Sequence, residues 1–254
     1  MDEVLRVSAV SQIFGGLKAL SDININIQKG EIVGVIGPNG AGKTTLFNII
    51  TGIYKPTGGQ IFLDGENVTG RKPHTIARKG FARTFQNIRL YKKMSVLDNV
   101  IVGMHSHTKS GLFDAVFHTS RNKKEEKACY ERAEELLKLM DLWEERFSYA
   151  ASLPYGSQRR LEIARALATR PKLLLLDEPA AGMNEQETEE LLRMVKKLKE
   201  NGETILLIEH DMKFVMNICE RLYVLNYGEV LESGTPAEVR NNPKVIEAYL
   251  GQED

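Results

Sequence analysis

Eight residues near the N-terminus have the types and the spacing that hold a chain of phosphates. Residues 37–44 read GPNGAGKT, which matches the pattern G-x-x-x-x-G-K-[ST] at every fixed position. Glycines let backbone N–H groups curl around phosphates, and Lys43 supplies a point charge for the β- and γ-phosphates. The Thr44 hydroxyl can ligate Mg²⁺. The pattern predicts nucleoside triphosphate binding by Gly37, Pro38, Asn39, Gly40, Ala41, Gly42, Lys43, Thr44 and Thr45.

This loop lies between the two elements that must position it. The apolar run 32–36 before it predicts a buried parallel strand, and the run 45–50 after it predicts a helix. The N-terminus of that helix adds partial positive charge where the phosphates would lie. A chance glycine turn between a strand and a helix is the alternative, and a full match in this context makes it much the weaker one.

An acidic pair follows a second apolar run. Residues 173–176 predict another buried strand, which leads into Asp177 and Glu178. Ligands bind at the carboxyl ends of such strands. Asp177 can hold Mg²⁺, usually through its water shell, and Glu178 can orient and deprotonate the water that attacks a γ-phosphate. A surface acidic pair that caps a strand is the alternative.

A histidine and a glutamine complete the candidate set. His210 closes the apolar run 204–208, from which it can reach a γ-phosphate, although a lone histidine is more often a structural hydrogen-bonding group. Gln86 is uninformative by itself, because most glutamines are surface polar residues.

The rest of the chain predicts the fold. Alternating runs at 5–10 and 23–27 indicate antiparallel strands with one solvated face. A polar middle, 85–153, carries a helix whose apolar residues recur at helical spacing, and Asn184 with Glu187 predicts the cap of a helix that ends at 201–202. The sequence thus predicts an α/β P-loop NTPase core with a parallel sheet, an N-terminal antiparallel layer and an inserted helical subdomain.

Composition excludes several classes of protein. With 34 basic and 34 acidic residues, the charge balance does not indicate a nucleic-acid partner. The two cysteines indicate no disulfide framework, which is typical of a reducing cytosol. No apolar run reaches the ~18 residues of a membrane span, and no signal peptide is recognisable. A membrane role therefore requires a partner.

Taken in order, these motifs resemble the nucleotide-binding subunit of an ABC transporter, over essentially the whole chain. The resemblance implies that Phe14 stacks on adenine, that Gln86 senses Mg²⁺ and water, and that His210 contacts the γ-phosphate of ATP. It implies one ABC ATPase domain, 1–254, with a nucleotide-binding core at 1–85 and 160–254 and a helical subdomain at 86–159.

The segment at the position of the family's signature motif departs from the pattern Leu-Ser-Gly-Gly-Gln. It reads LPYGSQRR at 153–160, so Pro154 replaces the serine whose hydroxyl would reach the partner's γ-phosphate. A lost neutral hydrogen bond is worth only ~1 kcal/mol net, which predicts weaker closure and not its loss. Asn184 likewise replaces an aspartate. The signature residues that the resemblance assigns to nucleotide binding are Leu153, Tyr155, Gly156 and Ser157.

The resemblance also implies partners. Two ATP molecules are sandwiched between two ATPase subunits, identical or different, and closure of the pair drives transmembrane permease subunits at the cytoplasmic face of the membrane. A periplasmic or extracellular solute-binding protein acts indirectly. The docking region is expected at 86–99, with contacts from Tyr91, Met94, Val96 and Leu97, unless these side chains pack within the subdomain.

Several details resemble the larger ATPase subunit of branched-chain amino-acid importers. They are RTFQNIRL at 83–90, the signature tyrosine, DEPAAG at 177–182, the tail 242–251 and an extended segment at 104–122. Related systems that import urea or amides, or export lipid or lipopolysaccharide, remain alternatives. A soluble ABC ATPase without a transport role is less favoured, because the insertion carries neither coiled-coil heptads nor cysteine pairs.

Overall fold

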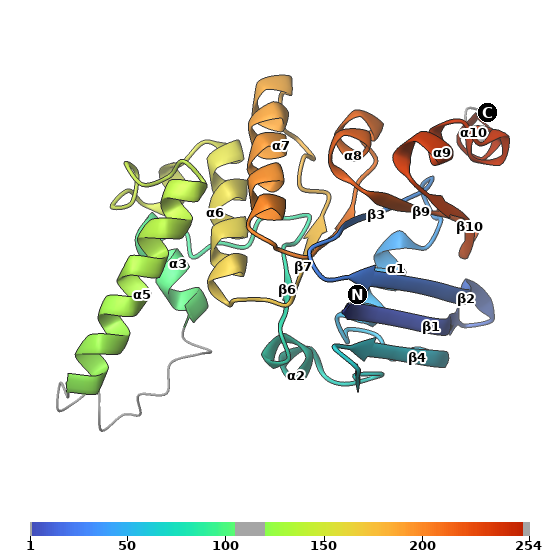
Figure 1. Cartoon of the computed structure of the whole chain (residues 1–254), viewed down its shortest axis with the longest axis horizontal. Helices are drawn as coiled ribbons and strands as arrows, with labels where there is room; N and C mark the ends of the chain where they lie inside the picture. The colour runs from blue at the N-terminus through green and yellow to red at the C-terminus, as the bar shows by residue number, and fades with distance from the viewer. Residues whose placement is uncertain (1, 105–119, 251–254) are drawn as a thin grey trace. The chain divides into compact units, whose positions relative to one another are not determined.

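The computed structural model describes residues 2–104 and 120–250, apart from the side chains of 120–124 and 250 (Figure 1). The chain divides into two compact units, one of residues 1–83 and 172–254 and one of residues 84–171. The expected boundaries at 85/86 and 159/160 differ from these. The second would cut helix α6 (Tyr155–Ala168), whose packing against other helices keeps it whole within the second unit.

The first unit contains a six-stranded sheet with the order β10-β9-β3-β8-β7-β6. Its strands are β3 (Ile32–Ile36), β6 (Phe81–Arg83), β7 (Leu173–Asp177), β8 (Ile205–Ile208), β9 (Arg221–Asn226) and β10 (Glu229–Gly234). All neighbours are parallel except β9 and β10. Every residue of β3, β7 and β8 is buried, as their continuous apolar runs predict.

A four-stranded antiparallel sheet forms the second layer of this unit, in the order β2-β1-β4-β5. Its strands are β1 (Glu3–Phe14), β2 (Leu17–Gln28), β4 (Gly58–Leu63) and β5 (Glu66–Asn67). The turn after β4 is formed by Asp64 and Gly65 with φ 50° and 76°, the left-handed geometry of a tight hairpin. The α/β fold with both sheets is confirmed.

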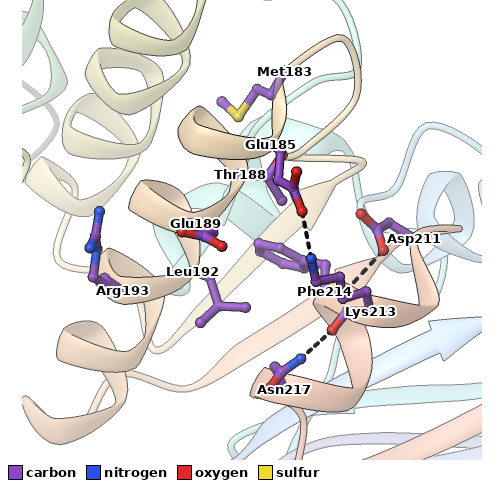
Figure 2. Close-up of a pocket in the computed structure, with 10 residues that line it drawn as sticks. All are labelled: Met183, Glu185, Thr188, Glu189, Leu192, Arg193, Asp211, Lys213, Phe214 and Asn217. Atoms are coloured by element: carbon purple, nitrogen blue, oxygen red, sulfur yellow. Dashed lines mark hydrogen bonds and ion pairs between the residues drawn. The ribbon is translucent and has the colours of Figure 1, made fainter.

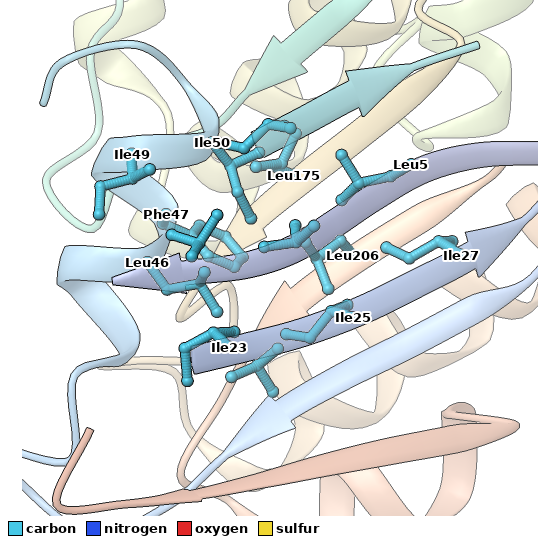
Figure 3. Close-up of a cluster of buried hydrophobic side chains, with 14 of the residues drawn as sticks. Leu5, Ile23, Ile25, Ile27, Leu46, Phe47, Ile49, Ile50, Leu175 and Leu206 are labelled. Carbon is cyan, nitrogen blue, oxygen red and sulfur yellow. The ribbon is translucent and has the colours of Figure 1, made fainter. Parts of the chain in front are cut away.

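One hydrophobic core joins these sheets to helix α1 (Lys43–Ile50), which follows the phosphate loop (Figure 3). Apolar side chains of β1, β2, β7, β8 and α1 meet there, among them Leu5, Ile23, Ile25, Ile27, Leu46, Phe47, Ile49, Ile50, Leu175 and Leu206. Since α1 is anchored from both layers, the start of the helix is fixed relative to the strands that carry the acidic pair.

Further helices complete the first unit. They are α2 (Pro73–Arg78), α7 (Glu185–Glu200), α8 (Met212–Ile218), α9 (Pro236–Arg240) and α10 (Pro243–Leu250). The predicted cap of α7 is present: the Asn184 side chain accepts from the Glu187 amide, and the Glu187 carboxylate accepts from the Asn184 amide. The helix ends at Glu200 with Asn201 as its C-cap, in agreement with the end expected at 201–202.

The second unit is helical. It contains α3 (Val96–Met104), α5 (Ser120–Leu139), the short helix η1 (Ala150–Ser152) and α6, and α3 packs against both α5 and α6. The residues of the predicted apolar stripe are buried: Ala133, Leu136 and Leu137 of α5, and Met140 just after it. None of the described helices combines the length and apolar character needed to cross a membrane. Most of the segment 104–122 lies outside the described residues.

The core around α1 gives a stability prediction. Phe47 is fully buried at the centre of the cluster, so Phe47→Ala should lower the free energy of unfolding by ~3–5 kcal/mol through lost burial and a cavity. Urea denaturation of both proteins measures this. A loss below about 1 kcal/mol would show that α1 does not depend on this core for its position.

Candidate nucleotide-binding site

The phosphate loop is pressed between two other backbones. Gly37 has φ 149°, and a Cβ there would lie 2.1 Å from the Leu225 carbonyl oxygen of β9. At Gly42, with φ 103°, a Cβ would lie 2.6 Å from Leu20 Cδ2 and 3.0 Å from the Ala19 carbonyl oxygen of β2. Only glycine fits both the space and the conformation, so strands far away in sequence shape this loop.

Lys43 is folded into this loop. Its side chain is buried, and Nζ donates to the carbonyl oxygens of Gly37 at 2.6 Å and Pro38 at 2.9 Å. Burial lowers the pKa of Lys43, and the charge of Glu178 opposes that shift. No side chain caps the N-terminus of α1, and Thr44 at its first turn is exposed. The uncapped first turn and the adjacent ammonium fit a bound phosphate chain.

Asp177 is the last residue of β7 and is buried beside Arg83, to which sequence reasoning gave no role at the site. Arg83, at the end of β6, places Nη2 2.7 Å from Asp177 Oδ2. Nη1 of the same guanidinium donates to Asn48 Oδ1 at 2.9 Å and Thr51 Oγ1 at 3.2 Å. Arg83 therefore ties the acidic strand to the end of α1. The position of Arg83 at the end of β6, which runs parallel to β7, was the feature that could have linked it to Asp177.

Glu178 lies where the chain leaves β7. Its φ of 46° is in the left-handed region, which is uncommon for a residue other than glycine, and its amide donates to the Ile208 carbonyl oxygen at 2.9 Å. The acidic pair thus sits beside the end of β8, which leads to His210. This is the arrangement of neighbouring strand ends that the apolar runs predicted.

A buried carboxylate, Glu209, organises the turn that holds His210. It is fully buried and accepts hydrogen bonds from the amides of Ala180 at 2.7 Å, His210 at 3.0 Å and Asp211 at 3.4 Å. Burial raises the pKa of Glu209, and these backbone bonds oppose the shift. The His210 side chain is 62% exposed. An acid that directly follows an apolar strand was the signal for Glu209, to which sequence reasoning gave no role.

Phe14 ends β1 and stands at the exposed tip of the β1–β2 hairpin. Its ring meets the ring of Tyr54 edge-on, with centroids 5.3 Å apart and an interplanar angle of 74°. The same hairpin presses Ala19 and Leu20 against Gly42 of the phosphate loop. The predicted adenine contact and the phosphate loop therefore share one structural support, and Tyr54 is an aromatic neighbour that sequence reasoning did not find.

The remaining predicted residues belong to the second unit. Gln86 is exposed, Leu153 and Gly156 are buried, and Tyr155 is the exposed first residue of α6. No side chain caps this helix, so its first-turn amides keep the donors that an anion requires. Ser157 Oγ accepts from Arg160 Nη2 at 2.9 Å.

A separate pocket of about 560 Å³ lies between α7 and α8 (Figure 2). Glu185 on one wall pairs with Lys213 on the other at 2.8 Å, and Asp211 caps α8 by accepting from the Phe214 amide. None of the predicted nucleotide-binding residues is among the described residues that line it.

Comparison with known proteins decides the family. A family model described as ABC transporter matches residues 20–181, which include the phosphate loop, the signature segment and the acidic pair. The chain belongs to the ABC transporter family. It is therefore a nucleotide-binding ATPase of that family. A second model, described as branched-chain amino acid ATP-binding cassette transporter, matches residues 229–254 of this ABC ATPase.

Individual relatives cover nearly all of this ABC ATPase. It is 48% identical over 250 residues, 98% of each chain, to the high-affinity branched-chain amino acid transport ATP-binding protein BraF of Pseudomonas aeruginosa. The same figures hold for LivG of Escherichia coli, which carries the same description. A crystal structure of an ATP-binding cassette in its ADP conformation is 34% identical, with a TM-score of 0.85 over 99% of this chain and 100% of that one. A dimeric bacterial ABC transporter cassette is 27% identical, with a TM-score of 0.76 over 91% and 98% of the two chains.

The ion pair between β6 and β7 gives a second prediction. Arg83→Met leaves the buried Asp177 carboxylate without this partner and should lower the free energy of unfolding by about 3–5 kcal/mol. The double variant Arg83→Met/Asp177→Asn removes both charges and should recover most of that loss. Thermal and urea unfolding of the three proteins tests this, and equal stability of the single and double variants would contradict the role of charge compensation.

Proposed function

We propose that this chain is the ATP-binding and hydrolysing subunit of an importer for branched-chain amino acids. The observation that carries the proposal is the 48% identity over 98% of both chains to ATP-binding proteins named for that transport. The match of the C-terminal residues 229–254 to a model of the same transporter class supports it independently of the catalytic motifs.

In this proposal ATP lies on the phosphate loop, with adenine against Phe14. Phosphate oxygens take over the Lys43 ammonium from the carbonyls of Gly37 and Pro38. Because that lysine is buried, its charge acts in a poorly screened environment and holds the γ-phosphate strongly. The loop amides and the uncapped start of α1 contact the remaining phosphate oxygens.

The residues fit a magnesium ion that accompanies ATP. The Thr44 hydroxyl and the Asp177 carboxylate are oxygen ligands of the kind that Mg²⁺ prefers, and the family resemblance adds Gln86 as a residue that senses the ion. When bound, Mg²⁺ neutralises charge on the β- and γ-phosphates. In the described part of the chain, no cluster of three or more His, Cys, Asp or Glu side chains is placed to hold a metal.

Glu178 accepts the proton of the attacking water and aligns it with the γ-phosphate. The left-handed backbone at Glu178 ends the extended run of β7 at this residue. His210 contacts the γ-phosphate from the adjacent strand end, on a turn that Glu209 fixes. Most of the rate enhancement then comes from positioning and from charge stabilisation.

The signature segment acts on the nucleotide of a second ATPase subunit. The contacts come from Leu153, Tyr155, Gly156 and Ser157, with the first-turn amides of α6 as donors in place of the missing serine hydroxyl. The dimeric relative supports such a pair. ATP binds the closed pair more tightly than the open one, which makes closure the mechanical output.

The output passes to transmembrane permease subunits at the cytoplasmic face of the membrane, and a solute-binding protein acts through them. Of the four predicted contacts, Tyr91 and Met94 are exposed, whereas Val96 and Leu97 are buried in the helical core. For Val96 and Leu97 the stated alternative therefore holds, because α3 turns both side chains inward to pack within the subdomain. Two strongly exposed aromatics, Phe147 and Tyr149, extend the surface, since the backbone of 146–151 pairs with that of 92–97.

Transport is tested directly in proteoliposomes that contain this chain with its permease subunits and solute-binding protein. Leucine should stimulate ATP hydrolysis and be taken up, while urea and short amides should do neither. Stimulation by urea alone would assign the related importer instead, and stimulation by no solute would contradict import.

The catalytic assignment gives a third prediction. Glu178→Gln should bind Mg-ATP as tightly as the native protein and hydrolyse it roughly 100-fold more slowly or worse, because the water loses its base. Lys43→Ala should lose nucleotide binding. Binding of a fluorescent ATP analogue measures nucleotide affinity, and release of inorganic phosphate measures hydrolysis.

The matched control is Glu185→Gln, which makes the same change at an exposed acid of α7. It should leave both binding and hydrolysis unchanged. An unaltered hydrolysis rate in Glu178→Gln would remove Glu178 from the catalytic role.

A further inference from the structure

The signature helix α6 carries an ion pair that is completely withdrawn from solvent. The side chains of Arg159 and Glu162 are 0% and 2% exposed, and Nη1 of the arginine lies 2.9 Å from Oε2 of the glutamate. Arg159 is the largest of the fully buried side chains. Burying two charges is rarely favourable compared with apolar residues of similar volume, so stability does not explain this pair.

The pair holds the loop that contains Gln86. Arg159 Nη1 donates to the Phe85 carbonyl oxygen at 2.6 Å, and Nη2 donates to the Gln86 carbonyl oxygen at 2.8 Å. Glu162 Oε1 accepts from the Arg89 amide at 3.1 Å. The rigid, planar fork of a guanidinium spans two successive carbonyls in one geometry only, which fixes the backbone of the loop at Gln86.

The same guanidinium reaches the signature segment. Nη2 also lies 3.3 Å from the hydroxyl of Tyr155, the residue that replaces the first glycine of the family pattern. Tyr155, Arg159 and Glu162 are spaced by four and three residues, which places them on one face of α6. One buried cation therefore contacts both the loop at Gln86 and the first residue of the signature helix.

We propose that Arg159 and Glu162 are positioning residues that clamp the Gln86 loop to the signature helix, so that the two move as one piece. This inference rests on the proposed function, in which Gln86 responds to the nucleotide of its own subunit and the signature segment binds the nucleotide of the partner. Through the clamp, a change in the contact between Gln86 and the nucleotide of its own subunit also moves the signature segment, which contacts the nucleotide of the partner. Tyr155 completes it from the helix N-terminus.

The clamp also accounts for the altered signature. A tyrosine at position 155 removes the flexibility of a glycine, and its hydroxyl gives the guanidinium a further acceptor. The contact between Tyr155 and Arg159 thereby holds the first turn of α6 in place, while the amides of that turn remain uncapped and can bind an anion.

The test compares three proteins in the Glu178→Gln background. The first has no further change, the second carries Arg159→Met/Glu162→Gln, and the third carries Arg132→Met/Glu135→Gln. Arg132 and Glu135 form an ion pair at 3.0 Å with the same spacing, on α5 of the same unit, but the pair is partly exposed. Glu162→Gln keeps an acceptor for the Arg89 amide, and removal of both charges avoids an unpaired buried charge.

Light scattering then measures the mass of each protein over an ATP titration. The parent and the α5 control should shift from monomer to dimer together, whereas the clamp variant should need roughly 10–100-fold more ATP or stay monomeric. Nucleotide affinity of the monomer should be equal in all three. Dimerisation of the clamp variant at the parent's ATP concentration would overturn the clamp.

A parent that stays monomeric with ATP would count against the two-subunit sandwich, and the clamp is then decided by hydrolysis with Glu178 restored. In that hydrolysis assay the clamp variant should have a lower kcat and an unchanged KM for ATP. The single variant Arg159→Lys keeps the charge but not the planar fork, so its kcat should lie between those of the clamp variant and the native protein. Equal kcat in the clamp variant and the native protein would refute the positioning role. Amide hydrogen exchange adds a local readout, since residues 85–89 should exchange faster in the clamp variant while α3 and α5 do not change.

Discussion

The close approach of three backbones at the phosphate loop is the constraint on which the rest of the first unit depends. Gly37 faces the carbonyl of Leu225 in β9, and Gly42 faces Ala19 and Leu20 in β2. These contacts leave no room for a Cβ, so the loop has one shape, and α1 must start where the core holds it. With the loop fixed, Lys43 and Thr44 take up their places, and the strand ends that carry Asp177, Glu178 and His210 converge in the same unit.

Buried charges with defined partners hold loops and strand ends within each of the two units. Arg83 joins Asp177 to the end of α1, and Glu209 gathers three amides at the turn before α8. In the second unit, Arg159 and Glu162 do the same for the loop at Gln86. Each charged group loses its hydrogen bonds to water when it is buried. Protein partners replace those bonds only when they are arranged around the group in one particular way. They therefore fix geometry at the points where an apolar contact would tolerate several geometries.

The family assignment and the unusual signature are compatible in this structure. Pro154 removes a hydroxyl, yet α6 still begins immediately after it with no side chain over its first-turn amides. Tyr155, which looks disruptive in place of glycine, is supported by Arg159. Replacement of the usual aspartate by Asn184 leaves a complete capping box on α7. At each departure from the family pattern, neighbouring groups thus provide an alternative: the amides of α6 beside Pro154, Arg159 beside Tyr155, and the capping box at Asn184.

The sequence alone determined the fold class, the order of motifs and the residues of the phosphate loop, because these follow from local rules. Continuous apolar runs predict buried parallel strands, alternation predicts the outer sheet, and a glycine pattern with lysine and threonine predicts phosphate binding. It also predicted the Asn184 cap, which depends on residues only three positions apart.

Only the tertiary structure decided which residues support these motifs. Arg83 and Asp177 are 94 positions apart, and Arg159 lies 73 positions from Gln86, so no local pattern connects them. Likewise, periodicity could not tell Val96 and Leu97, which are buried, from Tyr91 and Met94, which are exposed, because their environment is set by helices distant in the sequence. A motif can be read from the chain, but the long-range contacts that hold it in place exist only after the chain has folded.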